Sequence, residues 1–280
     1  MIKNQIKTTI LLVVLTGILL ILGRLIGGTS GLIIAFIIAL IMNFVSYWWS
    51  DKIVLFLYRA KEADKKKYSK LYELVREIST RAGIPKPRIF IMESGAANAF
   101  ATGRNPKHST VAFTTGILSI LSEEELRGVI AHEMSHIKNR DILIGSVVAV
   151  VVGTISFIAS MARFSAIFGG GRDNNGPSLL EFIFLLVLAP IIATILQLAI
   201  SRSREYLADE SGAKILKKSS GLADALIKLE SSAQEKPLGS NNATAHMFIV
   251  KPFSGGALLK LFSTHPPIEQ RVRKLRSMNY

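Results

Sequence analysis

The sequence predicts a mainly α-helical membrane protein that carries an α+β domain with a small β-sheet. Two observations predict this class. Four long runs of the chain are apolar and almost free of charge, and polar stretches separate and follow them. The first polar stretch combines helical spacing with short runs typical of strands. The chain has 280 residues, is 49% hydrophobic and has a mean hydropathy of +0.38, which is high for a soluble protein.

The first two apolar runs predict a pair of membrane-spanning helical anchors. Residues 8–23 carry no charge, and Arg24 at their end is placed to reach the interface. Residues 25–50 are also uncharged and end in Tyr47-Trp48-Trp49, aromatic side chains of the kind found at headgroup level. Each run is long enough, or nearly so, to cross a hydrocarbon core of about 30 Å. No signal-peptide cleavage site follows the first run, so we expect a retained anchor.

Residues 142–162 and 182–201 are two further apolar runs, which predict a second helical hairpin. Pro190 lies in the later run but is tolerated in spanning helices. A hairpin buried inside a soluble domain is the alternative for this pair, and the length of the runs favours the spanning interpretation. The four runs divide the chain into 1–50, 51–141, 142–201 and 202–280.

Basic residues flank the apolar runs unevenly, and the net charge is +14. Lys3 and Lys7 precede the first run, a dense lysine and arginine cluster follows the second, and only Arg24 lies between them. The positive-inside rule therefore predicts that both ends of the first hairpin are cytoplasmic. The lysines at 65–67 fit the surface of an anionic leaflet. A nucleic-acid partner is not expected, because no nucleic-acid-binding motif is found.

The polar stretches predict short helices and strands. Ser122 and Glu125 form an S-x-x-E capping box that opens a helix. The remaining expected elements are, in chain order, a helix over 64–82, strands over 88–92, 98–102 and 110–114 with a turn at 104–106, helices over 202–218 and 222–232, and a loop at 239–244.

The helix opened by Ser122 carries an H-E-x-x-H motif, His132-Glu133-Met134-Ser135-His136. Positions four apart share a helix face, so both imidazoles can point at one ion. Zinc binds neutral histidine nitrogen, and Glu133 is placed to take a proton from a water on the metal. The alternative is a solvated helix face with incidental histidines. It fits poorly, because the flanking residues are apolar and a buried glutamate without a partner is costly.

A catalytic zinc site needs a third protein ligand and one open position. The chain has no cysteine, so this ligand must be a histidine or a carboxylate. Glu205, four residues after the last apolar run, is the best candidate, and a hairpin of the third and fourth runs brings it beside His136. Asp209, one helical turn later, is placed to bond a ligand histidine. An interfacial charge cluster with Arg202 and Arg204 is the alternative.

With these residues in place, the chain resembles the HtpX family of membrane-embedded zinc metalloproteases, which are gluzincins related to the CAAX prenyl protease. The resemblance spans nearly the whole chain. It implies a zincin-type domain in which Glu205 is the third zinc ligand and Asp209 supports a ligand histidine. The motifs that carry it are the apolar anchors, Asn98-Ala-Phe-Ala-Thr-Gly103, the H-E-M-S-H core, the apolar hairpin, S-R-x-R-E-Y-x-A-D at 201–209, and His265-Pro266 with Arg271.

The resemblance also implies roles in substrate binding. It implies that His265 or Arg271 steadies the substrate or the oxyanion, which both side chains can do by donating to negative charge. The alternative there is a Pro-bounded helix start with a surface arginine. It further implies an edge strand on which extended substrate is laid, with a simple core strand as the alternative. This strand comprises Asn98, Ala99, Phe100 and Ala101.

These observations predict an endopeptidase with one zinc ion per chain, in which Glu133 passes the proton of a zinc-activated water to the leaving amine. Residues 51–141 and 202–280 are then two parts of one catalytic domain. The resemblance implies quality control under stress: misfolded or damaged membrane proteins are cleaved at the cytoplasmic side of a prokaryotic cell membrane.

A membrane adaptor with a structural metal site, with His265 as fourth ligand, is the alternative. A transporter is disfavoured, because the apolar runs contain almost no ionisable residue.

Overall fold

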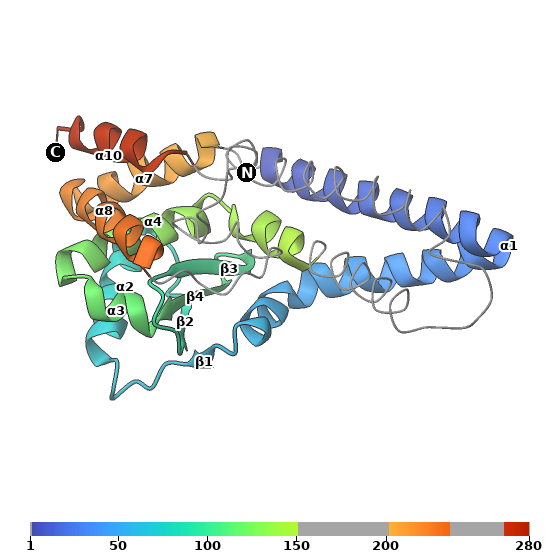
Figure 1. Cartoon of the computed structure of the whole chain (residues 1–280), viewed down its shortest axis with the longest axis horizontal. Coiled ribbons are helices and arrows are strands. Elements are labelled where there is room, and N and C mark those ends of the chain that lie inside the picture. Colours follow the sequence, from blue (N-terminus) through green and yellow to red (C-terminus); the bar gives the residue numbers. More distant parts are fainter. Residues whose placement is uncertain (1, 151–201, 236–265, 280) are drawn as a thin grey trace.

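The computed structural model describes residues 2–150, 202–235 and 266–279. They form a long helical arm and a domain of helices around a small sheet (Figure 1). Most of the predicted second hairpin, the predicted loop at 239–244 and His265 lie outside the described residues. The first part of the third apolar run, 142–150, is helical as predicted.

The arm is α1 (Ile2–Leu57), whose two halves run antiparallel (Figure 1). Gly28, where the chain turns back, has a φ of +59°, a conformation that glycine adopts without steric cost. The Asn43 side-chain amide donates to Thr16 Oγ1 over 2.9 Å and joins the two halves. Gly23 and Gly31 lie so close that a Cβ on Gly31 would collide with the Gly23 carbonyl. The first predicted hairpin is therefore present in the structure.

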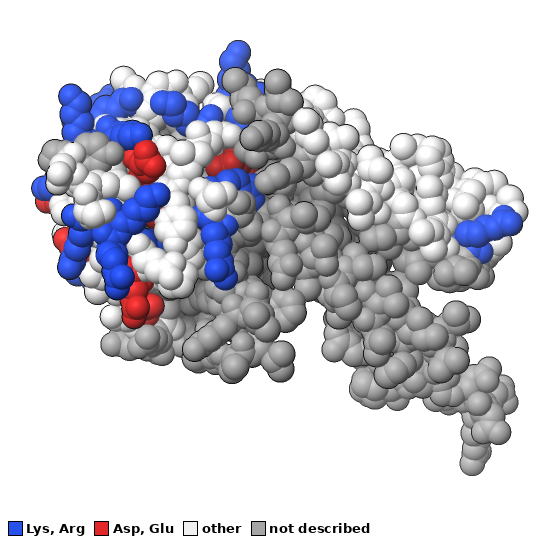
Figure 2. Space-filling model, turned by 90° about the horizontal axis from the view of Figure 1, so that it is seen from above, with Lys and Arg blue, Asp and Glu red and all other residues white. Residues whose placement is uncertain are grey.

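The second half of α1 has the properties of a membrane span. The segment Gly28–Leu57 is long and apolar enough to cross a bilayer, while the apolar part of the first half, Thr8–Ile21, is shorter. On the face shown in Figure 2, Lys and Arg gather over the domain, and along the visible part of the arm they appear at its far end. Many large apolar side chains of the arm are exposed, including Ile33, Ile34, Ile37, Leu40, Ile41, Phe44 and Phe56.

A four-stranded mixed sheet lies at the base of the arm. Its strands are β1 (Lys61–Glu62), β2 (Arg88–Met92), β3 (Ala99–Asn105) and β4 (His108–Thr114). Their order is β1-β2-β4-β3, with β2 and β4 parallel and the other neighbours antiparallel. The strand predicted at 88–92 is confirmed in full, and the one predicted at 110–114 begins two residues earlier, at His108. The strand predicted at 98–102 begins at Ala99 and continues to Asn105, so the turn expected at 104–106 lies at 106–107 instead. Within the described chain, β3 is an edge strand, as the resemblance implies.

Helices pack on the sheet and on one another around α4. The described domain helices are α2 (Ser69–Ala82), α3 (Thr115–Ile120), α4 (Glu123–Lys138), α7 (Arg202–Leu216), α8 (Ser220–Glu235) and α10 (Ile268–Arg276). The capping box at the start of α4 is confirmed: the Ser122 N–H donates to Glu125 Oε2 over 2.7 Å, and Ser122 Oγ accepts from the Glu125 N–H. Helix α4 packs against α2, α7, α8 and β3.

Both faces of the sheet are buried, so its strands lack the alternation of a half-exposed sheet. Ile89, Val111 and Phe113 face the core formed with α2, α4 and α8. Phe100 and Ala112 face the end of α1 and the helix 142–150. Burying each large apolar side chain contributes about 1.5–3 kcal/mol, so this packing holds α4 firmly.

Two glycines allow close helix crossings on α4. A Cβ on Gly128 would collide with the backbone of Leu222 in α8. A Cβ on Gly212 of α7 would lie 3.1 Å from the backbone nitrogen of His132, which is tighter than an ordinary contact. The small residue at this crossing lets α7 approach the H-E-x-x-H segment directly.

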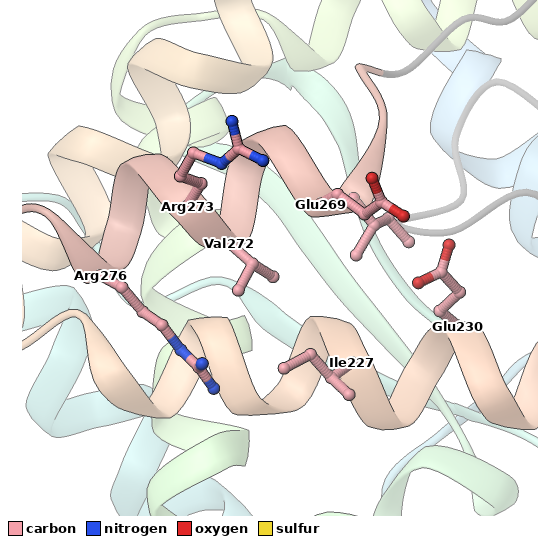
Figure 3. A pocket seen from close by; sticks show the side chains of 7 residues that line it. Ile227, Glu230, Glu269, Val272, Arg273 and Arg276 are labelled. Carbon is pink, nitrogen blue, oxygen red and sulfur yellow. The ribbon is translucent and has the colours of Figure 1, made fainter.

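A separate apolar groove runs between α8 and α10 (Figure 3). Ile227, Ile268 and Val272 form its apolar lining, and charged side chains line the rest of it. None of the predicted site residues lines this groove.

Candidate metal centre

The two histidines of the H-E-x-x-H motif lie one above the other on α4. Their ring centroids are 4.7 Å apart, and their Nε2 atoms approach to 3.1 Å. His132 is buried and His136 is half-buried. The motif therefore does not form a solvated helix face; both Nε2 atoms point to the same small volume.

Glu205, in the first turn of α7, completes a triangle with these two nitrogens. Its Oε2 lies 3.7 Å from His132 Nε2, and its Oε1 lies 3.6 Å from His136 Nε2. Ligands at about 2.0–2.1 Å from a tetrahedral zinc are about 3.3–3.4 Å apart. The three separations lie around this value, so the residues fit a zinc ion. Glu205 is only 6% exposed, and both of its carboxylate oxygens face the two histidines.

Each histidine has a carboxylate behind it. His132 Nδ1 lies 2.9 Å from Asp209 Oδ1, and His136 Nδ1 lies 3.2 Å from Asp141 Oδ2. A carboxylate at Nδ1 keeps the proton on that nitrogen and leaves the Nε2 lone pair for a metal. The sequence predicted Asp209 as the partner of a ligand histidine, without indicating which one, and did not predict Asp141, whose one signal is its place just after the motif helix.

Arg271 of α10 is not a surface arginine, because its side chain is fully buried. Its Nε donates to Asp209 Oδ2 over 2.8 Å and its Nη2 donates to Oδ1 over 2.7 Å. Its Nη1 lies 3.7 Å from Glu205 Oε2. Burial alone would raise the pKa of Asp209, but the bonds from Arg271 and His132 lower it to about 2. The pair is therefore ionised and supports His132 from behind.

Glu133 is only 4% exposed. Its pKa is raised to about 7, mainly by burial and also by the charge of Glu205. The charge of His136 and a hydrogen bond from the Ala101 backbone act in the opposite direction. A carboxylate near neutral pKa is suited to both accept and release a proton.

The predicted substrate strand borders this site. Ala99 and Phe100 are buried within β3, and the backbone of Ala101 reaches Glu133. The backbone N–H of Asn98 donates to Thr114 Oγ1 over 2.8 Å and fixes the start of the strand. The structure thus brings together the predicted metal ligands, Glu133, Asp209 and this strand, and adds Asp141. It places the predicted Arg271 against Asp209, with its Nη1 3.7 Å from Glu205 Oε2.

Two histidines and a glutamate around one small volume, with a buried glutamate between them and a sheet edge alongside, define a metal-dependent hydrolase of the H-E-x-x-H type. The sequence comparisons agree. Residues 65–279 match the family model described as Peptidase family M48. The chain therefore belongs to peptidase family M48, within its HtpX group, and is a metalloprotease.

Several relatives match over nearly their full length, and each is described as a Protease HtpX homolog. The relative from Persephonella marina is 53% identical over 280 residues, which cover 98% of this chain and 97% of that protein. The relative from Pyrococcus furiosus is 52% identical over 275 residues, which cover 98% of this chain and 95% of that protein. These matches confirm the family resemblance found in the sequence.

The fold is similar to that of a solved structure, S. mikatae Ste24p. The TM-score is 0.54 at 19% sequence identity, and the match covers 98% of this chain and 66% of Ste24p. The chain thus spans slightly less than two thirds of the length of Ste24p. At this identity the similarity concerns the fold alone.

Proposed function

We propose that this metalloprotease is a zinc-dependent endopeptidase of a membrane, with its active site on the cytoplasmic side. The observation that carries the proposal is the convergence of His132, His136 and Glu205, whose ligand atoms all lie within 4.8 Å of one another. Glu133 sits on the same helix as the two histidines, beside the backbone of β3.

The residues of this chain divide the chemistry among them. His132, His136 and Glu205 would hold a zinc ion, which when bound supplies Lewis-acid activation of a water and of the scissile carbonyl. Glu133 takes the proton of the attacking water and delivers it to the leaving amine. Asp209 and Arg271 hold His132 in the tautomer and orientation that a ligand needs.

The edge strand gives a route for binding polypeptides of many sequences. We propose that extended substrate lies along residues 98–101, at the start of β3, and binds through main-chain hydrogen bonds, which do not depend on side-chain identity. The contact between Ala101 and Glu133 supports this position, because it brings the sheet edge next to the proposed base. Recognition of this kind suits unfolded segments. His265 is proposed to assist there as a hydrogen-bond donor to the substrate.

The arm and the charge distribution support a membrane location. Exposed apolar side chains cover α1, and Trp48 and Trp49 lie near its domain end, where aromatics mark a headgroup region. Lysines 65–67 are exposed and follow this end closely. We therefore propose a multi-pass protein of a prokaryotic cell membrane, with a cytoplasmic domain that removes misfolded or damaged membrane proteins under stress.

Digestion of casein by the purified full-length protein tests the proposed activity. We expect cleavage that a zinc chelator abolishes and added zinc restores. Glu133→Gln should lower the rate at least 100-fold while zinc remains bound, because it removes the base and leaves the ligands. Glu124→Gln, on the exposed side of the same helix, is the matched control. Bound zinc without chelator-sensitive cleavage would contradict the proposal and favour an adaptor with a structural metal site.

A further inference from the structure

We infer that Asp141 is a positioning residue for His136 and links the metal centre to the start of the helix 142–150. This inference rests on the proposed function, because it takes His136 to be a metal ligand. Asp141 stands immediately after the turn that ends α4 and immediately before the third apolar run. It is therefore the residue at which the proposed catalytic helix passes into a predicted membrane helix.

The geometry fits an orienting contact. Asp141 Oδ2 lies 3.2 Å from His136 Nδ1, and Asp141 is only 8% exposed. The other ring nitrogen, Nε2, faces His132 Nε2 at 3.1 Å and Glu205 Oε1 at 3.6 Å. When Nδ1 donates to the carboxylate, the Nε2 lone pair points at the metal position. The contact fixes both the tautomer and the rotation of the ring.

The backbone delivers this carboxylate by a tight turn. Helix α4 ends at Lys138, and Arg140 has a φ of +59°, which turns the chain back. The Arg140 N–H donates to the Ile137 carbonyl over 3.1 Å, and the Asp141 N–H donates to the His136 carbonyl over 3.0 Å. Asp141 therefore contacts His136 twice, through its backbone and through its side chain. This double contact leaves little freedom for the carboxylate to move away from the ring.

The same residue is fixed to the next helix. The Asp141 carbonyl accepts from the Gly145 N–H over 3.4 Å, and the neighbouring Ile142 is buried in the main core. One turn further, Ser146 Oγ lies 2.6 Å from Thr102 Oγ1 of β3. A shift of this helix would therefore move Asp141 and the strand β3 together. The orientation of the His136 ring therefore depends on the position of the helix 142–150.

A second role for Asp141 must be separated from the first. Aspartate preceding a helix is a favoured N-cap, so its carboxylate can serve the helix 142–150 instead of His136. Serine is about as good an N-cap as aspartate, but its hydroxyl is too short to reach His136 from the same backbone position. Asparagine keeps both a cap and an acceptor of the same length, without the charge. These two substitutions separate capping from positioning.

Zinc affinity of the full-length protein in detergent, measured by competition with a chromophoric chelator, tests the inference. Removing an outer carboxylate typically weakens zinc binding 10–100-fold. We expect a loss of this size for Asp141→Ser, a smaller loss for Asp141→Asn, and an altered visible spectrum of the cobalt-substituted Asp141→Ser protein. Thermal unfolding of the metal-free Asp141→Ser protein should match that of the parent.

Wild-type zinc affinity in Asp141→Ser would overturn the inference. A loss of zinc affinity in Asp141→Ser would also overturn it if the melting temperature of the metal-free variant fell below that of the parent. That pattern is expected when the substitution removes a helix cap. His136→Gln separates this failure from that of the proposed function. If His136→Gln binds zinc as tightly as the parent, the assignment of His136 as a ligand is wrong, and the inference falls with it.

Discussion

At the scale of single residues, the buried ion pair of Arg271 and Asp209 is the contact whose disruption should cost the most folding stability. Both side chains are almost fully inaccessible, and two hydrogen bonds of 2.7 and 2.8 Å join them. Removing one partner of such a pair leaves an uncompensated buried charge, which typically costs about 3–5 kcal/mol. The pair lies at the candidate metal centre, where Asp209 Oδ1 is 2.9 Å from His132 Nδ1.

Arg271→Lys should therefore destabilise the protein and weaken its zinc binding. A lysine supplies one ammonium in place of the planar fork that bonds both carboxylate oxygens. We expect a loss of about 2–3 kcal/mol in the free energy of unfolding, on the low side of the loss for complete removal of the charge. The measurement is chemical unfolding together with zinc content. Arg276→Lys, on the exposed side of the same helix, is the control, and equal behaviour of the two variants would contradict the account.

Residue spacing predicted the three candidate ligands better than it predicted the residues that contact them. His132 and His136 were found because four residues make one helical turn, and Glu205 because of its place after an apolar run. The burial of Arg271 was not predicted, because it depends on how α10 packs against α7 and α8. Asp141 was missed, because its approach to His136 depends on a left-handed residue at Arg140 that the sequence does not indicate.

At the scale of elements, the capping box at the start of α4 makes stability depend on pH. Glu125 accepts from the Ser122 N–H and pairs with Lys228 at 2.8 Å. Burial opposes the shift, but these partners lower the pKa of Glu125 below 4.5. The unfolded chain therefore binds the proton more readily. The contribution of Glu125 to stability is present above about pH 4.5 and is lost as the pH falls through the lower pKa of the folded state.

Glu125→Gln should lower the melting temperature at pH 7 and have a smaller effect below about pH 4. Glutamine keeps the capping geometry and loses the ion pair, so we expect at most about 1 kcal/mol, since Lys228 is about half exposed. Thermal unfolding at a series of pH values measures this difference. Glu73→Gln, on the exposed face of α2, should show no such profile. A difference that stays constant down to pH 3 would contradict the assignment.

The reversal of α1 can be tested with a pair of cysteines, because the chain has none of its own. Thr16 and Asn43 contact across the hairpin, whereas in a straight helix 27 residues apart they would be about 40 Å distant. Thr16→Cys with Asn43→Cys should form an intramolecular crosslink, detected by mass spectrometry after oxidation. Thr16→Cys with Phe44→Cys, whose second position is exposed on α1, should crosslink far less. Equal yields would contradict the hairpin.

Most elements were predicted because their signals are local. The strand over 88–92 and the helix opened by Ser122 have apolar spacing and caps within a few residues. The two-residue strand β1 and the six-residue helix α3 were not predicted, because segments this short carry no periodicity. Their presence is decided by pairing with β2 and by packing after β4, which are tertiary contacts.

At the scale of the whole molecule, the site exists because distant parts of the chain meet around α4. Helix α4 supplies two predicted ligands, α7 supplies the third, and α10 supplies Arg271 behind them. The residues between α4 and α7 include the two later apolar runs. The sequence predicted that α4 and α7 lie side by side, because it assumed a hairpin between them. It did not predict the close approach of α7 at Gly212 or the packing position of α10, which depend on shape complementarity.

Three side chains, two from α4 and one from α7, are proposed to hold one zinc ion. Elemental analysis of the purified full-length protein, beside Glu205→Ala and Glu133→Gln, tests this proposal most directly. We expect about one zinc per chain in the parent and in Glu133→Gln, and a large loss in Glu205→Ala, because only the last variant removes a proposed ligand. A full zinc content in Glu205→Ala, or none in the parent after growth with zinc, would contradict it.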